Sequence, residues 1–96
     1  MNISKEIQEF MLNDALDRFL RYVRIWTTSD ESVETVPSTN NQFDLGKMLV
    51  EELKEFNLEN IIQDEYGFVY ACLPPSDGFK KAKAIGLIAH LDTSPA

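Results

Sequence analysis

The residues best suited to chemistry are His90 and Asp92, which stand two positions apart near the end of the sequence. They follow residues 84–89, a run of aliphatic and small side chains that predicts a strand buried on both faces. In an open α/β sheet, ligands bind just beyond the carboxyl ends of the strands. A histidine placed there can give one ring nitrogen to a metal ion, while the aspartate holds the other nitrogen or orients a bound water. The spacing alone is equally satisfied by a solvent-facing histidine followed by an aspartate that starts a turn.

Length and charge limit the classes of function. The chain has 96 residues, which suggests one small domain or a piece of one. Its net charge is −7, with sixteen acidic residues against nine basic ones. This balance disfavours binding to nucleic acid, which needs basic patches, and to anionic membrane surfaces. No apolar run approaches a membrane span, and the N-terminus lacks the features of a signal peptide. We therefore expect no nucleic-acid partner and no membrane partner.

The chain contains one cysteine, Cys72, and one histidine. A single cysteine cannot form an intrachain disulfide, so we expect a cytoplasmic location. One cysteine and one histidine also cannot supply the four ligands of a self-contained thiolate zinc site.

A first helix is expected within residues 4–26. Its apolar residues recur at helical spacing and would form one stripe, made of Leu12, Ala15, Leu16, Phe19, Val23 and Trp26, with Ile3, Ile7 and Phe10 extending it backwards. Asn13 and Asp14 could instead cap a fresh start, which would leave the first dozen residues as a separate short helix. The three arginines at positions 18, 21 and 24 are interpreted as a solvated face of this helix.

A second helix is expected over residues 41–56. A polar loop precedes it, and Thr39 and Gln42 then have the spacing of a capping box with Thr39 as the N-cap. Gly46 would cost roughly 1 kcal/mol of helix stability relative to alanine, unless a neighbour packs close to it. Asn57 is suited to the left-handed conformation that ends a helix.

Strands are expected in the second half of the chain. Residues 61–62 and 68–73 are rich in β-forming side chains, and the turn residues at 64–67 between them predict a hairpin. With the strand at 84–89, this predicts an α/β arrangement in which two helices pack on a small mixed sheet of about three strands. The strand at 84–89 needs cover on both faces, and few residues follow it. We therefore expect an incomplete domain.

Several stretches together resemble a known family. They read DRFLRYV at residues 17–23, VPSTNNQ at residues 36–42 and GLIAHLDTSP at residues 86–95. In this order the chain resembles the peptidase T family, tripeptide aminopeptidases of the di-zinc aminoacylase/carboxypeptidase class. The pattern H-x-D-T-S-P after an apolar strand is far more specific than H-x-D alone. Residues 1–96 would then be the N-terminal part of the metallopeptidase catalytic domain, with residues 1–12 as an extension. WTTS at residues 26–29 departs from the D-T-Q-S expected of the family.

The resemblance implies roles for two residues only. His90 matches the first zinc-ligand histidine, and Asp92 matches the catalytic-site aspartate that supports it. In such enzymes two zinc ions polarise the scissile carbonyl and activate the water that releases the N-terminal residue of a tripeptide. The other ligands and the general-base glutamate have no counterpart in this chain. We therefore expect the chain alone to be inactive and to bind zinc only weakly.

Two other interpretations stay open. One is a non-catalytic α/β module that self-associates, in which His90 and Asp92 are relics. Exposed strand edges and apolar patches mark association sites, so we expect a homo-oligomer. The other is a stand-alone enzyme with a different chemistry. It is the weakest interpretation, because the chain offers no Ser/His/Asp triad distinguishable from chance and no glycine-rich phosphate loop.

Overall fold

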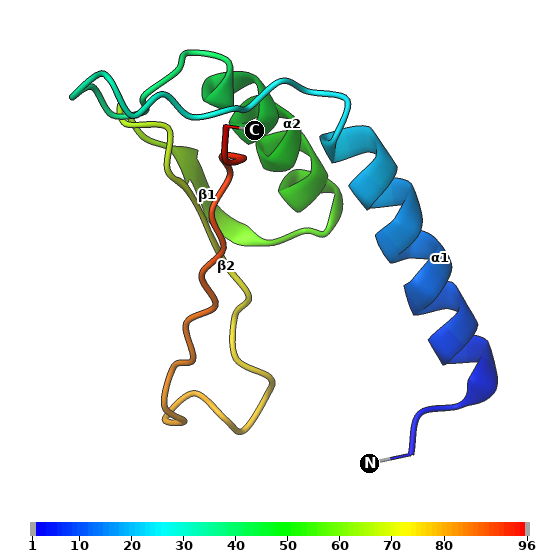
Figure 1. The fold of residues 1–96 in the computed structure, drawn as a ribbon. Helices are drawn as coiled ribbons and strands as arrows, with labels where there is room; N and C mark the ends of the chain where they lie inside the picture. The colour runs from blue at the N-terminus through cyan, green and yellow to red at the C-terminus, as the bar shows by residue number, and fades with distance from the viewer. Residues whose placement is uncertain (1, 96) are drawn as a thin grey trace.

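The computed structural model describes residues 2–95 and contains two helices followed by a hairpin. In chain order the elements are α1 (Lys5–Tyr22), α2 (Gln42–Glu55), β1 (Glu59–Gln63) and β2 (Val69–Cys72). Helix α2 lies against the two strands, and α1 stands to the other side of α2 (Figure 1). The α/β arrangement with two helices is thus confirmed. The sheet, however, has two antiparallel strands in the described residues, where about three in a mixed sheet were expected.

Helix α1 is one continuous helix. The hydroxyl of Ser4 accepts a hydrogen bond from the backbone N–H of Ile7 (3.2 Å) and caps the N-terminus. The helix passes Asn13 and Asp14 without a break, so the alternative of two short helices is wrong. It ends at Tyr22, four positions before the predicted end. None of its residues is buried, and the predicted apolar stripe faces solvent along most of its length.

Helix α2 begins at Gln42, and the predicted N-cap is wrong. Asn41 occupies the capping position and makes no side-chain capping bond. The hydroxyl of Thr39 donates instead to the backbone carbonyl of Thr28 (2.9 Å) and accepts from the amide of Gln42 (3.1 Å). At the other end, Asn57 has φ 57°, so the predicted left-handed terminator is confirmed.

The hairpin packs on α2 through a close approach at Gly46. A Cβ atom on this glycine would collide with the side-chain amide of Gln63 and would lie 3.3 Å from Val69 Cγ2. A neighbour therefore packs closely against Gly46, as the sequence required for a glycine within this helix. The turn of the hairpin is held by Asp64, whose carboxylate accepts hydrogen bonds from the backbone N–H groups of Tyr66 and Phe68 (2.9 Å each).

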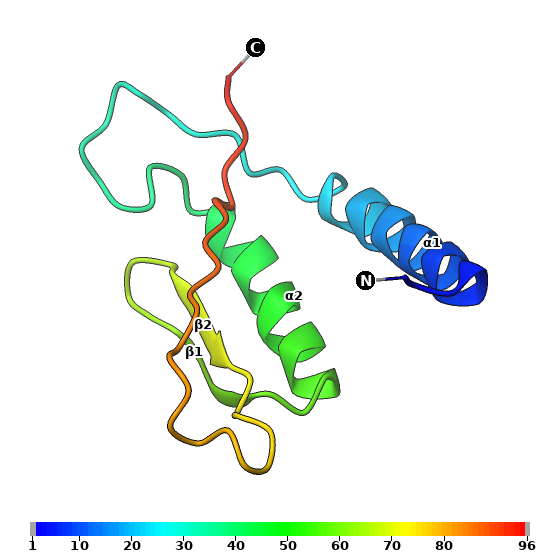
Figure 2. The ribbon, with the colours of Figure 1, turned by 90° about the horizontal axis from the view of Figure 1, so that it is seen from below.

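Residues 84–89 do not form the predicted third strand. They run from the 73–83 loop past the hairpin, but they pair with no strand of the described chain (Figures 1 and 2). Leu87 and Ile88 are 94% and 99% exposed, so the predicted burial is also wrong within this chain. A ladder needs backbone hydrogen bonds to a neighbouring strand, and this segment makes none to either free edge of the two-stranded hairpin. In the described part of the chain, no helix is long and apolar enough to cross a membrane.

Candidate functional site

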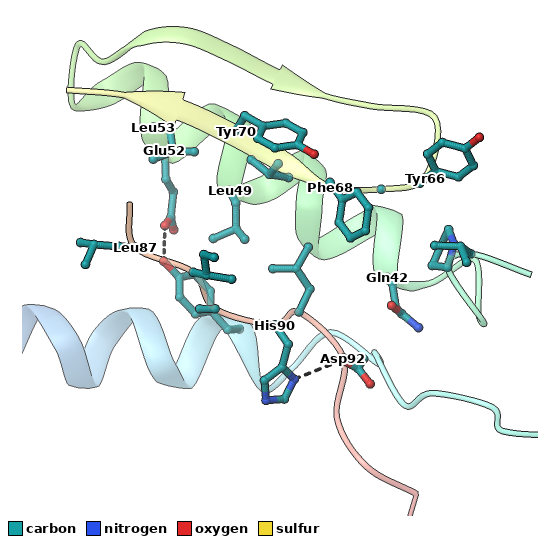
Figure 3. A pocket seen from close by; sticks show the side chains of 18 of the residues that line it. Gln42, Leu49, Glu52, Leu53, Tyr66, Phe68, Tyr70, Leu87, His90 and Asp92 are labelled. Atoms are coloured by element: carbon teal, nitrogen blue, oxygen red, sulfur yellow. Dashed lines mark hydrogen bonds and ion pairs between the residues drawn. The ribbon is translucent and has the colours of Figure 1, made fainter. Parts of the chain in front are cut away.

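His90 and Asp92 lie together just after the extended segment, as expected. Asp92 Oδ1 lies 3.1 Å from His90 Nδ1, which is hydrogen-bonding distance, and Figure 3 shows the two side chains turned toward each other. The imidazole is 81% exposed and the carboxylate is 38% exposed. The contact occupies Nδ1 and leaves Nε2 as the ring nitrogen that a ligand can reach. His90 and Asp92 were expected at the carboxyl end of a strand over residues 84–89, and because that segment is not paired as a strand, this position is not confirmed in the described residues.

The backbone after Asp92 is anchored to the loop that follows α1. Thr93 N–H donates to the carbonyl of Thr27 (3.1 Å), and Ser29 N–H donates to the carbonyl of Thr93 (2.9 Å), which makes a short parallel bridge. Thr27 is 4% exposed. Thr39 holds the same loop through its bond to the Thr28 carbonyl. Sequence reasoning treated this stretch as a plain loop, and only its place in the family pattern distinguished it.

Two open hollows meet at the His90–Asp92 pair. The larger, about 730 Å³, lies between α2, the hairpin and the returning segment that ends in His90, Leu91 and Asp92 (Figure 3). Aromatic and aliphatic side chains line most of it, namely Leu49, Leu53, Phe56, Phe68, Tyr70 and Leu87. The smaller, about 460 Å³, lies between the end of α1 and the same three residues. Both volumes are in the range of ligand pockets.

The described residues supply only part of a zinc site. Residues 2–95 contain no cluster of three or more His, Cys, Asp or Glu side chains that could hold a metal ion. Zinc sites in proteins use three or four protein ligands. The orientation of His90 by Asp92 fits the arrangement of a zinc-binding histidine, in which a carboxylate fixes the tautomer. The pair thus fits one ligand with its support, and the site is not completed within the described chain.

A second polar cluster, which sequence reasoning missed, joins α1 to α2. Its centre is Glu52, whose side chain is 7% exposed. Arg18 Nη1 lies 2.9 Å from one carboxylate oxygen and Arg21 Nη1 lies 2.5 Å from the other, and the hydroxyl of Tyr22 also donates to the carboxylate. Arg18 also lies over the ring of Phe56, 4.6 Å from its centroid.

The cluster changes the interpretation of the arginines. Burial, followed by the hydrogen bond to Glu52, raises the pKa of Tyr22. Hydrogen bonding to Asp14 raises the pKa of Arg18, so its charge is secure. Two of the three arginines that were interpreted as a solvated face are thus engaged in the contact between the helices. The spacing of positions 18, 21 and 22, which share one helix face, was the available signal.

Comparison with known proteins gives one consistent result. Peptidase T of Clostridium acetobutylicum is 49% identical over 84 residues, which are 88% of this chain and 20% of that protein. Peptidase T of Halothermothrix orenii is 51% identical over 80 residues, 83% of this chain and 19% of that protein. Peptidase T of Geobacillus thermodenitrificans is 47% identical over 85 residues, which are 88% of this chain and 20% of that protein. No family model matches the chain.

The chain therefore spans about one fifth of the length of the curated relatives that it matches. The matches extend over most of this chain, and the matching proteins come from several organisms and share one name. The resemblance expected from the sequence motifs is confirmed: over most of its length, this chain is similar to a segment of peptidase T.

Proposed function

We propose that this chain contributes to a zinc-dependent aminopeptidase that releases the N-terminal residue from tripeptides, with His90 as a zinc ligand. The observation that carries the proposal is the 3.1 Å contact between His90 Nδ1 and Asp92 Oδ1. The similarity to peptidase T supports the class of reaction.

The chemical roles follow from the contact. The Asp92 carboxylate accepts a hydrogen bond from Nδ1–H of the imidazole, which fixes the neutral tautomer and leaves the Nε2 lone pair for the metal. The same hydrogen bond holds the ring in one orientation, so that Nε2 is presented to the metal. Zinc, when bound in enzymes of this class, polarises the scissile carbonyl and activates a water. The anchored Thr93 backbone keeps Asp92 in reach of the imidazole.

The 96-residue chain alone is proposed to be inactive. One histidine and its supporting carboxylate leave a zinc ion short of the protein ligands that it normally has. We include a cytoplasmic location in the proposal, because Cys72 is a free and exposed thiol, which suits a reducing compartment.

The second candidate is a non-catalytic α/β module that forms a homo-oligomer. The exposed side chains of Leu87 and Ile88 favour it, because apolar surface of this kind marks association sites. The two candidates differ in what they require of His90. The enzyme needs it, and the module does not.

The deciding experiment is a chimera. The segment of C. acetobutylicum peptidase T that matches this chain is replaced by the corresponding residues of this chain, and tripeptide hydrolysis is measured with added zinc. We expect an active chimera, loss of activity and of bound zinc with His90→Ala, and a drop of roughly 10- to 100-fold with Asp92→Asn. Asp77→Asn, a surface carboxylate in the 73–83 loop, is the matched control and should leave activity unchanged. Full activity in the His90→Ala chimera would refute the proposal.

A further inference from the structure

The residues that form the bridge to Thr93 are held from two sides. On one side, the carbonyl of Thr27 accepts a hydrogen bond from Thr93 N–H (3.1 Å), and Ser29 N–H donates to the Thr93 carbonyl (2.9 Å). On the other side, the carbonyl of Thr28 accepts from the hydroxyl of Thr39 (2.9 Å). In the described part of the chain, the hydrogen bonds of these three residues go to Thr93 or to Thr39. Thr39 is thus the hydrogen-bonded link from the bridge to the rest of the fold.

The hydroxyl of Thr39 is directed by its neighbour Gln42. A hydroxyl has one proton to donate and lone pairs with which to accept. The side-chain amide Nε2 of Gln42 donates to Thr39 Oγ1 (3.1 Å), so the oxygen accepts on that side and its proton is free for the Thr28 carbonyl. The three groups therefore form a chain of hydrogen bonds with one direction, from amide to hydroxyl to carbonyl.

This chain of hydrogen bonds starts from the most firmly packed part of the fold. Gln42 is the first residue of α2, which contains the buried residues Leu45 and Gly46. The next residue, Phe43, is tied to β1, because its backbone carbonyl accepts from the side-chain amide of Gln63 (3.2 Å). Helix α1, which precedes the bridge, buries none of its residues. The bridge is therefore held in place chiefly by the start of α2.

The other end of the chain of hydrogen bonds is the candidate metal site. Thr93 directly follows Asp92, whose Oδ1 lies 3.1 Å from His90 Nδ1. Both Gln42 and Asp92 line the larger hollow (Figure 3). The hydrogen bond between carboxylate and imidazole weakens steeply when its distance or angle changes, so a displaced bridge would loosen it. Restraint of Thr93 is thus restraint of the pair.

We infer that Thr39 and Gln42 are positioning residues for the candidate metal site. The Gln42 amide directs the Thr39 hydroxyl to the Thr28 carbonyl, this bond keeps the bridge closed, and the closed bridge keeps Asp92 in reach of the imidazole. The inference rests on the proposed function for the role of the site. It adds two residues that make no hydrogen bond to either member of the pair.

Two variants break the chain of hydrogen bonds in different ways. Thr39→Val removes the hydroxyl and leaves a side chain of similar shape. Gln42→Glu reverses the direction, because a carboxylate only accepts: it takes the proton of the Thr39 hydroxyl in a charge-assisted bond, and the Thr28 carbonyl loses its donor. Negative charge in the first turn stabilises a helix, so α2 should remain folded in this variant.

Two controls match these variants. Thr39→Ser keeps the hydroxyl and should behave as wild type. Ser38→Ala removes the neighbouring hydroxyl, which accepts from Asp30 N–H (3.0 Å) in the same loop and makes no hydrogen bond to the Thr28 carbonyl. It should therefore leave the bridge unchanged.

The first measurement is amide hydrogen exchange at Thr93 in the 96-residue chain, followed by NMR. Loss of one hydrogen bond that supports the bridge should accelerate this exchange about 5- to 10-fold in Thr39→Val and in Gln42→Glu. Exchange within α2 (Gln42–Glu55) should not change, which verifies that the variants are folded. If Thr39→Val unfolds α2, Gln42→Glu decides the question.

The second measurement reports the pair itself and would not respond to a purely structural role. In mildly alkaline buffer, where a histidine ring is neutral, the nitrogen chemical shifts of His90 show which ring nitrogen carries the proton. The hydrogen bond to Asp92 favours the Nδ1–H tautomer in wild type. Thr39→Val and Gln42→Glu should shift the ring toward the Nε2–H form, in the direction of Asp92→Ala, which gives the value for a ring without its partner.

The outcomes separate the inference from the proposed function. Equal exchange at Thr93 in wild type, Thr39→Val and Gln42→Glu overturns the inference. Faster exchange with an unchanged tautomer of His90 overturns it as well, because the bridge would then support the loop alone. A Thr39→Ser chain that behaves like Thr39→Val has the same consequence. Neither measurement uses zinc or a substrate, so an inactive wild-type chimera refutes the proposed function alone.

Discussion

Replacing Glu52 with glutamine should release α1 from the rest of the molecule. Glu52 receives charge-assisted contacts from Arg18 and Arg21 and a hydrogen bond from Tyr22, all three on α1. Helix α1 buries none of its own residues, so little else holds it in place. A helix of 18 residues is only marginally stable in water by itself. The loss of the Glu52 charge should therefore appear as fraying of α1, while α2 and the hairpin stay folded.

The magnitude follows from the exposure of each partner. A hydrogen bond to a charged group contributes about 1.5–3 kcal/mol when it is largely buried, which applies to the contact of Glu52 with Arg18. Arg21 is 38% exposed, so its ion pair is screened by solvent and is worth about 1 kcal/mol at most. Glutamine keeps an acceptor for Tyr22 but loses the charge. We expect the docking of α1 to weaken by about 2–3 kcal/mol, which corresponds to a roughly 30- to 150-fold change in its opening equilibrium.

Amide hydrogen exchange, read separately for α1 and α2, measures this effect. Exchange in Lys5–Tyr22 should accelerate by the stated factor, and exchange in Gln42–Glu55 should change little. Glu51→Gln is the matched control, because Glu51 is the neighbouring carboxylate, is 70% exposed and pairs only with Lys54 on its own helix. If α1 exchanges at the same rate in wild type, Glu52→Gln and Glu51→Gln, the reasoning about the cluster is wrong.

Three further outcomes are expected. Because burial and a hydrogen bond raise the pKa of Tyr22, the stabilisation from its neutral phenol is present below the usual value of 10 and is lost as the pH rises through the raised value. The phenolate absorbance that Tyr22→Phe removes should thus appear at higher pH in the folded chain than in denaturant. Calorimetry should find no submicromolar zinc site in a single chain, and such a site, if abolished by His90→Ala, would contradict the ligand count. Gly46→Val should lower the free energy of unfolding by about 1–3 kcal/mol in thermal denaturation because its side chain meets Gln63, whereas Gly86→Val, with open space around it, should not.

The features that sequence reasoning predicted correctly are mostly local. The hairpin follows from turn chemistry at Asp64 and Gly67, where φ is 85° at the glycine. The end of α2 follows from the left-handed conformation of Asn57. The pairing of His90 with Asp92 needs only two residues of separation. In each case the residues that make the structure are neighbours in the sequence, so their types and spacing contain the information.

The features that were missed depend on contacts between distant parts of the chain. The partner of Arg18 is 34 positions away, and the charge pattern of one helix does not name a partner on another. The bridge between Thr28 and Thr93 joins residues 65 positions apart. The capping-box spacing predicted that the Thr39 hydroxyl caps the second helix. That hydroxyl instead donates to the backbone carbonyl of Thr28, which is 11 positions away, and α2 begins at Gln42.

The failure at residues 84–89 differs from the others. The aliphatic pattern predicts a strand, and the segment is extended, but a strand is completed only by neighbours that donate and accept its backbone hydrogen bonds. The two sides of the site are held differently. After Asp92, Thr93 is fixed by backbone hydrogen bonds to Thr27 and Ser29, whereas the segment before His90 makes no backbone hydrogen bond in the described chain. The carboxylate is thus anchored more firmly than the imidazole that it orients. The direction of His90 therefore depends on how residues 84–89 are held, whereas the direction of Asp92 is set by backbone hydrogen bonds that the described chain already makes.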